Sequence, residues 1–281
     1  MSTPRPEAQA NSTLRPEAQA NSTLRVTQAR VMKSEWTKLR TQPGAQWSLL
    51  SAVVLVVASG ILYSLLRVAR PPHGAAAATF DPTSVSLAGV QLAQIAAGVL
   101  GVLLITSEYA TGLIRTTLAA VPRRLPTLRG KAVVLAAAVV AVSVPAAVAV
   151  FLAGQSILGR QHLSTSFGDP GVARAVIGSA LYLAVAGLLG LALGALLRST
   201  AGGIATLFGL LFAVPILVGF LPGSLSDEIG KYLPGAAGLA VTTVHTDPAT
   251  SLAPWTGFGV FCAYAAVLLG FAAVRMRRGD A

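Results

Sequence analysis

The stretch AVVLAAAVVAVSVPAAVAVFLAG, residues 132–154, decides the fold class of this chain. It contains no Asp, Glu, Lys or Arg, and it exceeds the roughly 20 apolar residues that a helix needs to cross a hydrocarbon layer. Five further windows of this kind cover residues 47–66, 85–105, 175–197, 201–221 and 254–274. A helix satisfies its own backbone hydrogen bonds in lipid. The sequence therefore predicts an all-α, polytopic membrane protein with six transmembrane helices.

The overall composition agrees with a membrane location. Hydrophobic residues make up 54% of the chain and charged residues only 11%, and the mean hydropathy is +0.69. A soluble domain does not have these values. The net charge of +11 is expected from basic segments beside an anionic leaflet. No basic stripe with interleaved aromatic residues is present, so we expect no nucleic-acid partner.

Lysine and arginine set the predicted orientation, because they gather on the cytoplasmic side of membrane proteins. Most of the 21 basic residues precede the first window, follow the last, or lie between the second and third. The opposite side keeps Arg67, Arg70, Arg160, Arg174 and Lys231. We therefore expect both termini to be cytoplasmic and the chain to be a multi-pass protein of the cytoplasmic membrane.

Two segments precede the first window. Residues 1–25 contain the stretch RPEAQANSTL twice, at 5–14 and 15–24, and this polar sequence predicts a disordered tail. Residues 26–43 predict an amphipathic helix ended by Pro43 and lying in the membrane interface. Its predicted apolar face consists of Ala29, Met32, Trp36 and Leu39. Lys33 and Arg40 flank this face, whereas Lys38 is predicted to point away from it.

A charged insert, SEYATGLIRTTLAAVPRR at residues 107–124, separates the second and third windows. It is too short for a domain but long enough for a helical extension, a turn at Gly112 and a second short helix ending before Pro122. One interpretation is a loop whose arginines enforce topology. Topology alone does not call for an acidic residue, a tyrosine and a glycine, so a docking element is the better interpretation.

The chain resembles the permease subunits of type-2 ABC exporters, especially the compact actinobacterial kind. The resemblance rests on SEWTKLRT (34–41), on the insert followed by LRGK (128–131), and on YLPGAAG (232–238). It implies that residues 26–43 form the connecting helix of the family. It also implies that residues 107–124 form the coupling segment that binds the ATP-binding subunit. The implied coupling residues are Glu108, Tyr109, Thr111, Gly112, Ile114, Arg115 and Thr117.

The same resemblance implies the partners, and the low charge of the spanning windows indicates the substrate class. Residues 44–281 would form the six-helix transmembrane domain, with a re-entrant external segment within 222–252. Two ATP-binding subunits would supply ATP and Mg²⁺, and a second permease copy, identical or homologous, would complete the pathway. We expect a hydrophobic or amphipathic exported compound, such as an antibiotic, a peptide or a lipid, and hence a role in antibiotic resistance. Few polar residues lie in the spanning windows, among them Gln91, Gln94, Ser143, Ser179, Tyr182 and Thr206. Of these, Gln91, Gln94 and Tyr182 are the candidates for lining the substrate pathway.

Catalysis within the chain is not expected. No GxxxxGK[ST] phosphate-binding loop is present, so ATP hydrolysis is assigned to the partner and no cofactor to this chain. Cys262 is the single cysteine, and His245 with Asp247 provides too few ligands for a metal. The alternatives are a secondary, ion-coupled transporter, in which Pro145 and Pro215 break helices to expose carbonyls, and a non-transporting membrane scaffold.

Overall fold

A computed structural model describes residues 28–74, 80–110, 124–245 and 247–278. Every regular element in these ranges is helical. The longer helices are α1 (Gln28–Thr41), α2 (Pro43–Ala69), α5 (Val90–Ala110), α7 (Arg124–Leu158), α8 (Val172–Leu197), α9 (Thr200–Phe208), α11 (Gly223–Gly230) and α13 (Pro254–Arg278). The short ones are α4 (Pro82–Ser86), η1 (Gly159–Gln161), the π-helix η2 (Gly209–Ala213), α10 (Val214–Val218), α12 (Pro234–Leu239) and η3 (Ala240–Thr242).

Six of the described helical units are long and apolar enough to cross a membrane: α2, α5, α7, α8, the continuous α9–η2–α10 unit and α13. This confirms the predicted all-α, polytopic fold. The duplicated tail at 1–25 lies outside the described residues. The predicted amphipathic helix is α1, and Pro43 opens α2 directly after it, because proline fits the first turn of a helix, where its missing N–H is not needed.

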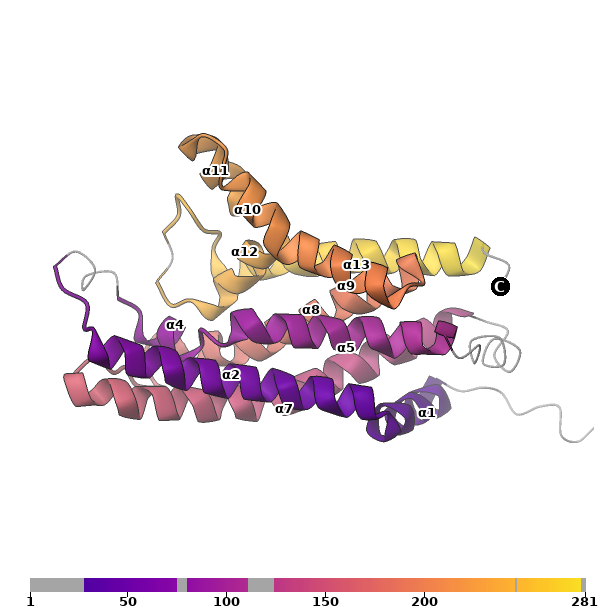
Figure 1. Ribbon diagram of the computed structural model, residues 1–281, viewed down its shortest axis with the longest axis horizontal. Coiled ribbons are helices and arrows are strands. Elements are labelled where there is room, and N and C mark those ends of the chain that lie inside the picture. The colour runs from indigo at the N-terminus through magenta and orange to yellow at the C-terminus, as the bar shows by residue number, and fades with distance from the viewer. Residues whose placement is uncertain (1–27, 75–79, 111–123, 246, 279–281) are drawn as a thin grey trace, which may run out of the picture.

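The bundle has two distinct ends (Figure 1). One end carries α1, the last turn of α5 and the C-terminal end of α13, and we call it the base. The other end carries α4, α11 and α12, and we call it the far end. Both ends of the described chain therefore lie on the same side of the six spanning units.

Helix α8 forms the centre of the bundle, and it packs against α5 through glycines. A Cβ atom added at Gly190 would lie 2.0 Å from the carbonyl oxygen of Gly98, and one added at Gly101 would lie 1.9 Å from that of Gly187. Side chains at these positions would collide with backbone, so the two helices are in direct backbone contact. Small residues permit such approach in membrane helices, where dispersion contacts drive association.

The second predicted window was wrong at its beginning. Residues 85–89 do not belong to the spanning helix: α4 ends at Ser86, and a turn leads to Val90. Asp81 starts α4 as an N-cap, because its carboxylate accepts hydrogen bonds from the backbone N–H groups of Thr83 and Ser84. In the turn, Gly89 approaches α2 so closely that a Cβ atom would lie 2.4 Å from the Val56 carbonyl oxygen.

The two prolines considered as helix breakers behave differently. Pro145 lies inside α7, which continues without a break through it. Pro215 lies just after the π-helix η2. Proline lacks an N–H and collides with the carbonyl four residues before it, and a widened π turn accommodates both defects. Among the described residues, only the fifth spanning unit therefore departs from regular α-helix at a proline.

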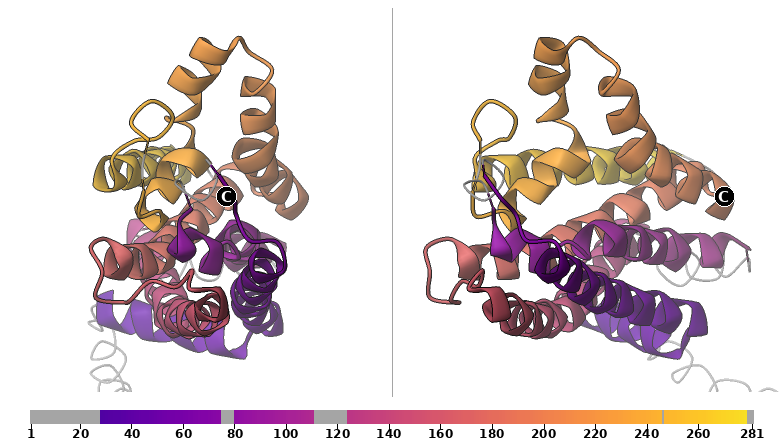
Figure 2. Two further views of the ribbon diagram at one scale, coloured as in Figure 1. Left: turned by 90° about the vertical axis from the view of Figure 1, so that its left-hand side faces the viewer. Right: turned by 60° about the vertical axis from the view of Figure 1, so that its left-hand side comes forward.

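The segment between α10 and α13 forms short helices rather than an open loop. Figure 2 shows α10 and α11 projecting away from the layer of α2, α5 and α7. In contrast, α12 and η3 are largely buried. A Cβ atom added at Gly238 of α12 would lie 2.6 Å from both Tyr182 of α8 and Phe261 of α13. The apolar run that includes 234–242 is thus packed among the spanning helices.

Candidate functional site

Four charged side chains meet at the base, and we call them the charge cluster: Glu35, Lys38, Glu108 and Lys131. The Lys131 Nζ atom lies 2.6 Å from Oε2 of Glu35 and 2.8 Å from Oε1 of Glu108. The Lys38 Nζ atom lies 3.0 Å from Oε1 of Glu35 and 2.8 Å from Oε1 of Glu108. Each lysine therefore bridges both carboxylates, and the cluster as a whole is neutral.

The charge cluster joins three elements. Glu35 and Lys38 come from α1, Glu108 from the last turn of α5, and Lys131 from the early turns of α7. Its exposure is low, with 1% for Glu35, 3% for Glu108 and 1% for Lys131, while Lys38 is half-buried. A buried ion without its partner destabilises the folded state, and removing one member of such a pair typically lowers the free energy of unfolding by about 3–5 kcal/mol. The cluster therefore ties α1 to the ends of α5 and α7.

Lys38 corrects the predicted orientation of α1. We expected this side chain to point away from the packed face of the helix, and that is wrong, because it donates hydrogen bonds to Glu35 and Glu108. Leu39 is buried, at 4% exposure, and Met32 packs against the core, but Trp36 is 42% exposed. Lys33 and Arg40 are exposed. The face of α1 that meets α5 and α7 therefore includes Glu35, Lys38 and Leu39 rather than Trp36.

The environment of Lys38 favours its charged form. Burial by itself lowers the pKa of this lysine, but hydrogen bonds and attraction to Glu108 and Glu35 outweigh burial. Its pKa therefore lies above the ordinary lysine value of 10.5. The cluster remains ion-paired at Lys38 throughout the physiological pH range.

The last turn of α5 also contacts two other helices. The Thr200 hydroxyl, at the start of α9, donates to the Thr106 hydroxyl at 2.8 Å. The guanidinium of Arg198, at the end of α8, lies 5.5 Å from the centre of the Tyr109 ring, within the range of a cation–π interaction. With Glu108 between them, these residues make one helical turn of α5 the meeting point of α1, α7, α8 and α9.

Most of the predicted coupling segment lies outside the described residues. Glu108 lies in the charge cluster, and Tyr109 is half-buried beneath Arg198. The remaining predicted coupling residues lie outside the described residues: Thr111, Gly112, Ile114, Arg115 and Thr117. The described helices that flank this segment end at Ala110, two residues after Glu108, and resume at Arg124, seven residues before Lys131.

The predicted pathway residues separate into two groups. The Tyr182 hydroxyl donates to the side-chain oxygen of Gln94, and the Tyr182 ring stacks on Phe261 with centroids 5.1 Å apart. Tyr182 is 0% exposed and Gln94 is 3% exposed, so this pair is enclosed by the chain. Gln91 is exposed and does not join them. The structure therefore gives Gln94 and Tyr182 an interhelical hydrogen bond in the interior of the bundle.

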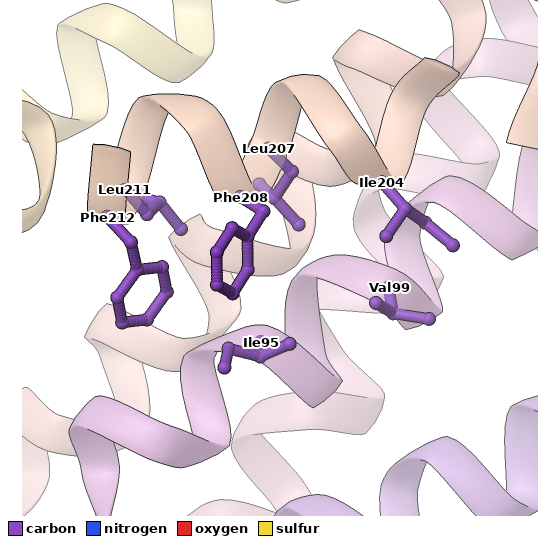
Figure 3. A pocket seen from close by; sticks show the side chains of 7 residues that line it. All are labelled: Ile95, Val99, Ile204, Leu207, Phe208, Leu211 and Phe212. Atoms are coloured by element: carbon purple, nitrogen blue, oxygen red, sulfur yellow. The ribbon is translucent and has the colours of Figure 1, made fainter. Parts of the chain in front are cut away.

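An apolar groove between α5 and the α9–η2 unit was not anticipated from the sequence (Figure 3). Its lining residues are Ile95, Val99, Ile204, Leu207, Phe208, Leu211 and Phe212. The Phe208 and Phe212 rings stack with centroids 4.9 Å apart, and Phe208 is 52% exposed. The widened turn of η2 carries Leu211 and Phe212, so the helix irregularity lies at the groove.

No group of three or more metal-ligating side chains occurs in the described part of the chain. The two lysines and two glutamates of the charge cluster form ion pairs with one another. Comparison of the sequence with known protein families and with curated proteins finds no match.

Proposed function

We propose that this chain is the permease subunit of an ATP-driven exporter of the type-2 ABC family. The observation that carries the proposal is the charge cluster. It joins a helix of amphipathic sequence, α1, to the two helix ends that bracket residues 111–123. A partner that binds residues 111–123 would act on both helix ends and on α1 together.

Such an arrangement suits the transmission of force. Closure of an ATP-binding partner has to reach the membrane helices through stiff elements, and packed helices move as units. The ion pairs of Lys131 connect α7 to both α1 and α5, at distances of 2.6 and 2.8 Å. Contacts of Thr106 and Tyr109 extend this connection to α9 and α8. Movement at the base would therefore spread to most of the bundle.

The ATPase belongs to a separate subunit in this proposal. The given sequence contains no GxxxxGK[ST] loop for the phosphates of ATP. Two ATP-binding subunits with ATP and Mg²⁺ would complete the exporter. The basic residues near the base favour a cytoplasmic position for it, on the side where ATP is available.

In this proposal the substrate is hydrophobic or amphipathic, because the predicted spanning windows offer few polar side chains and none with a charge. The apolar groove has this chemistry, but its volume of about 10 Å³ is too small to hold a substrate by itself. A second permease copy, identical or homologous, would cover this side of the bundle. Two large exposed side chains, Ile216 of α10 at 62% and Phe220 just after α10 at 82%, are available for contact with it or with lipid.

Copurification tests the proposal. The tagged chain is purified from native membranes in mild detergent, and bound proteins are identified and assayed for ATP hydrolysis. We expect a stoichiometric ATPase, and we expect Gly112→Pro to release it, since proline would distort the coupling segment. Gly168→Pro, in the exposed loop between α7 and α8 at the far end, is the matched control and should retain the ATPase.

Two results would overturn the proposal. One is the absence of any ATPase from the wild-type preparation, which would favour the ion-coupled transporter. The other is an ATPase that both variants retain equally, which would remove residues 111–123 from the docking surface.

A further inference from the structure

A second groove lies at the base, between α7 and α13, on a different pair of helices from the apolar groove. Its volume is about 250 Å³, and its lining residues are Leu128, Arg129, Ala132, Leu269, Gly270, Ala273 and Arg277. We call it the base groove. Its walls are apolar except for one arginine from each helix.

The lining residues form one stripe on each helix. Positions 269, 270, 273 and 277 follow helical spacing along α13, as do 128, 129 and 132 along α7. At 1.5 Å per residue, the stripe on α13 runs about 12 Å from Arg277 toward the middle of the spanning helix. The groove therefore has a basic mouth at the base and an apolar interior.

Protein does not fill this groove. A Cβ atom added at Gly270 would meet no other atom within 4 Å. Arg129 and Arg277 are exposed, and among the described residues neither forms an ion pair, whereas Lys131 nearby is committed to the charge cluster. Two guanidinium groups above an apolar slot complement a molecule that carries an anionic head and a hydrocarbon chain.

We propose that the base groove binds one anionic glycerophospholipid of the leaflet at the base, with its phosphate between Arg129 and Arg277 and part of an acyl chain along Gly270. Basic pockets between spanning helices have the chemistry that such headgroups require. The site is independent of the proposed export function. A lipid bound there would stabilise the packing of α13 against the turn of α7 that carries Lys131.

Native mass spectrometry of the full chain tests this proposal. The delipidated protein in mild detergent is titrated with phosphatidylglycerol or with phosphatidylcholine of identical acyl chains. We expect one phosphatidylglycerol per chain to bind at least tenfold more tightly than phosphatidylcholine. Arg129→Gln and Arg277→Gln are each expected to weaken phosphatidylglycerol binding about fivefold and to leave phosphatidylcholine binding unchanged.

A second set of variants tests whether the apolar part of the groove holds an acyl chain. Gly270→Phe is expected to weaken phosphatidylglycerol binding more than tenfold, because the ring occupies the acyl-chain path. Gly259→Phe is the matched control on the same helix, since Gly259 is exposed, has no atom within 4 Å of an added Cβ, and lies outside the groove. Circular dichroism and a thermal melt of each variant show that it is folded.

Three results would overturn the proposal. The first is equal affinity of the wild-type chain for the two lipids. The second is arginine variants that bind phosphatidylglycerol as tightly as the wild type. The third is full displacement of phosphatidylglycerol by glycerol phosphate together with no effect of Gly270→Phe, which would identify a site for free phosphate rather than for a lipid.

Discussion

The two ends of the bundle are held together by different chemistry. At the base, side chains from α1, α5 and α7 meet in a network of four ion pairs, in which Glu35, Glu108 and Lys131 are buried and Lys38 is half-buried. At the far end, the described segments are joined by hydrogen bonds rather than by ion pairs: the Asp81 carboxylate accepts from the Val244 N–H at 3.0 Å, Arg174 donates to the Thr243 carbonyl at 3.0 Å, and the Gln155 amide donates to the Ser86 hydroxyl at 3.1 Å. The hydrogen bonds of Arg174 and Asp81 hold residues 243 and 244 at the far end.

The difference indicates which end moves as a unit. Separating the base helices would expose unpaired charges in a buried site, which costs several kcal/mol, whereas the far-end hydrogen bonds are each worth about 1 kcal/mol net. The base is thus suited to transmit displacement, and the far end is suited to open. The predictions below test this contrast, beginning with the largest expected effect.

Lys131→Met is expected to lower the stability of the bundle by about 3–5 kcal/mol, because it leaves Glu35 and Glu108 buried with only one lysine between them. Thermal unfolding of the purified protein in detergent measures the loss. Lys33→Met removes an exposed lysine from α1 and should leave the melting midpoint unchanged. Equal midpoints for the wild type and Lys131→Met would contradict the assigned role of the cluster.

The double variant Glu35→Gln/Lys131→Met sharpens this test. It restores charge balance and retains the ion pair of Lys38 with Glu108, so it is expected to be more stable than Lys131→Met alone. A double-mutant cycle on melting midpoints measures the coupling between the two positions. Additive losses would mean that Glu35 and Lys131 do not stabilise each other.

Asp81→Ala is expected to have a smaller and more local effect, about 1–2 kcal/mol, because it removes the N-cap of α4 and the acceptor for the Val244 amide. Hydrogen exchange should become faster in residues 234–245 and stay unchanged in α1 and in the last turn of α5. Asp169→Ala is the control, because the carboxylate of this exposed aspartate at the same end accepts hydrogen bonds only from Thr165 and Ser166 of its own loop among the described residues. Faster exchange at the base in Asp81→Ala would refute the independence of the two ends.

The smallest effect is a pH dependence at the base. The pKa of Lys38 is raised in the folded chain, so its contribution to stability is complete below the unfolded value of 10.5 and is lost as pH rises through the folded value. The melting midpoint should therefore show no loss from this group between about pH 7 and about pH 9, and it should fall above pH 10.5. In Lys38→Gln this alkaline decline should become shallower, and an unchanged decline would contradict the assignment.

Sequence patterns predicted which helices span the membrane, but not which of them is buried at the centre of the bundle. Helix α8 and the α9–η2–α10 unit have nearly equal mean hydropathy, yet 78% of the α8 window is buried and only 17% of the other. Length and apolarity suffice to identify a spanning helix. Burial depends instead on which helices allow close contact, and the glycines at 187, 190 and 194 were the available signal for α8.

The candidate site was predicted only in part. Glu108 was identified through the charged insert, but its partners Lys38 and Lys131 were not, because they lie 70 and 23 positions away and no helical period relates them to it. The signal present in the sequence was Glu35, which lies one helical turn before the apolar residue Leu39 and therefore on the same face of the helix. The apolar groove was not predicted either, since it depends on how α9 and η2 pack against α5.

The central claim is that the charge cluster passes the movement of an ATP-binding partner to the far end of the bundle. A direct test is double electron–electron resonance, which measures the distance between two spin labels. The labels are attached at Gly168→Cys and Ser224→Cys, both exposed far-end positions, in a Cys262→Ser background with the ATPase bound. With ATP, Mg²⁺ and vanadate, the account predicts a shifted distance distribution in the otherwise wild-type chain. It predicts no shift in Glu35→Gln/Lys131→Met, which stays charge-balanced. The same shift in both proteins would contradict the claim.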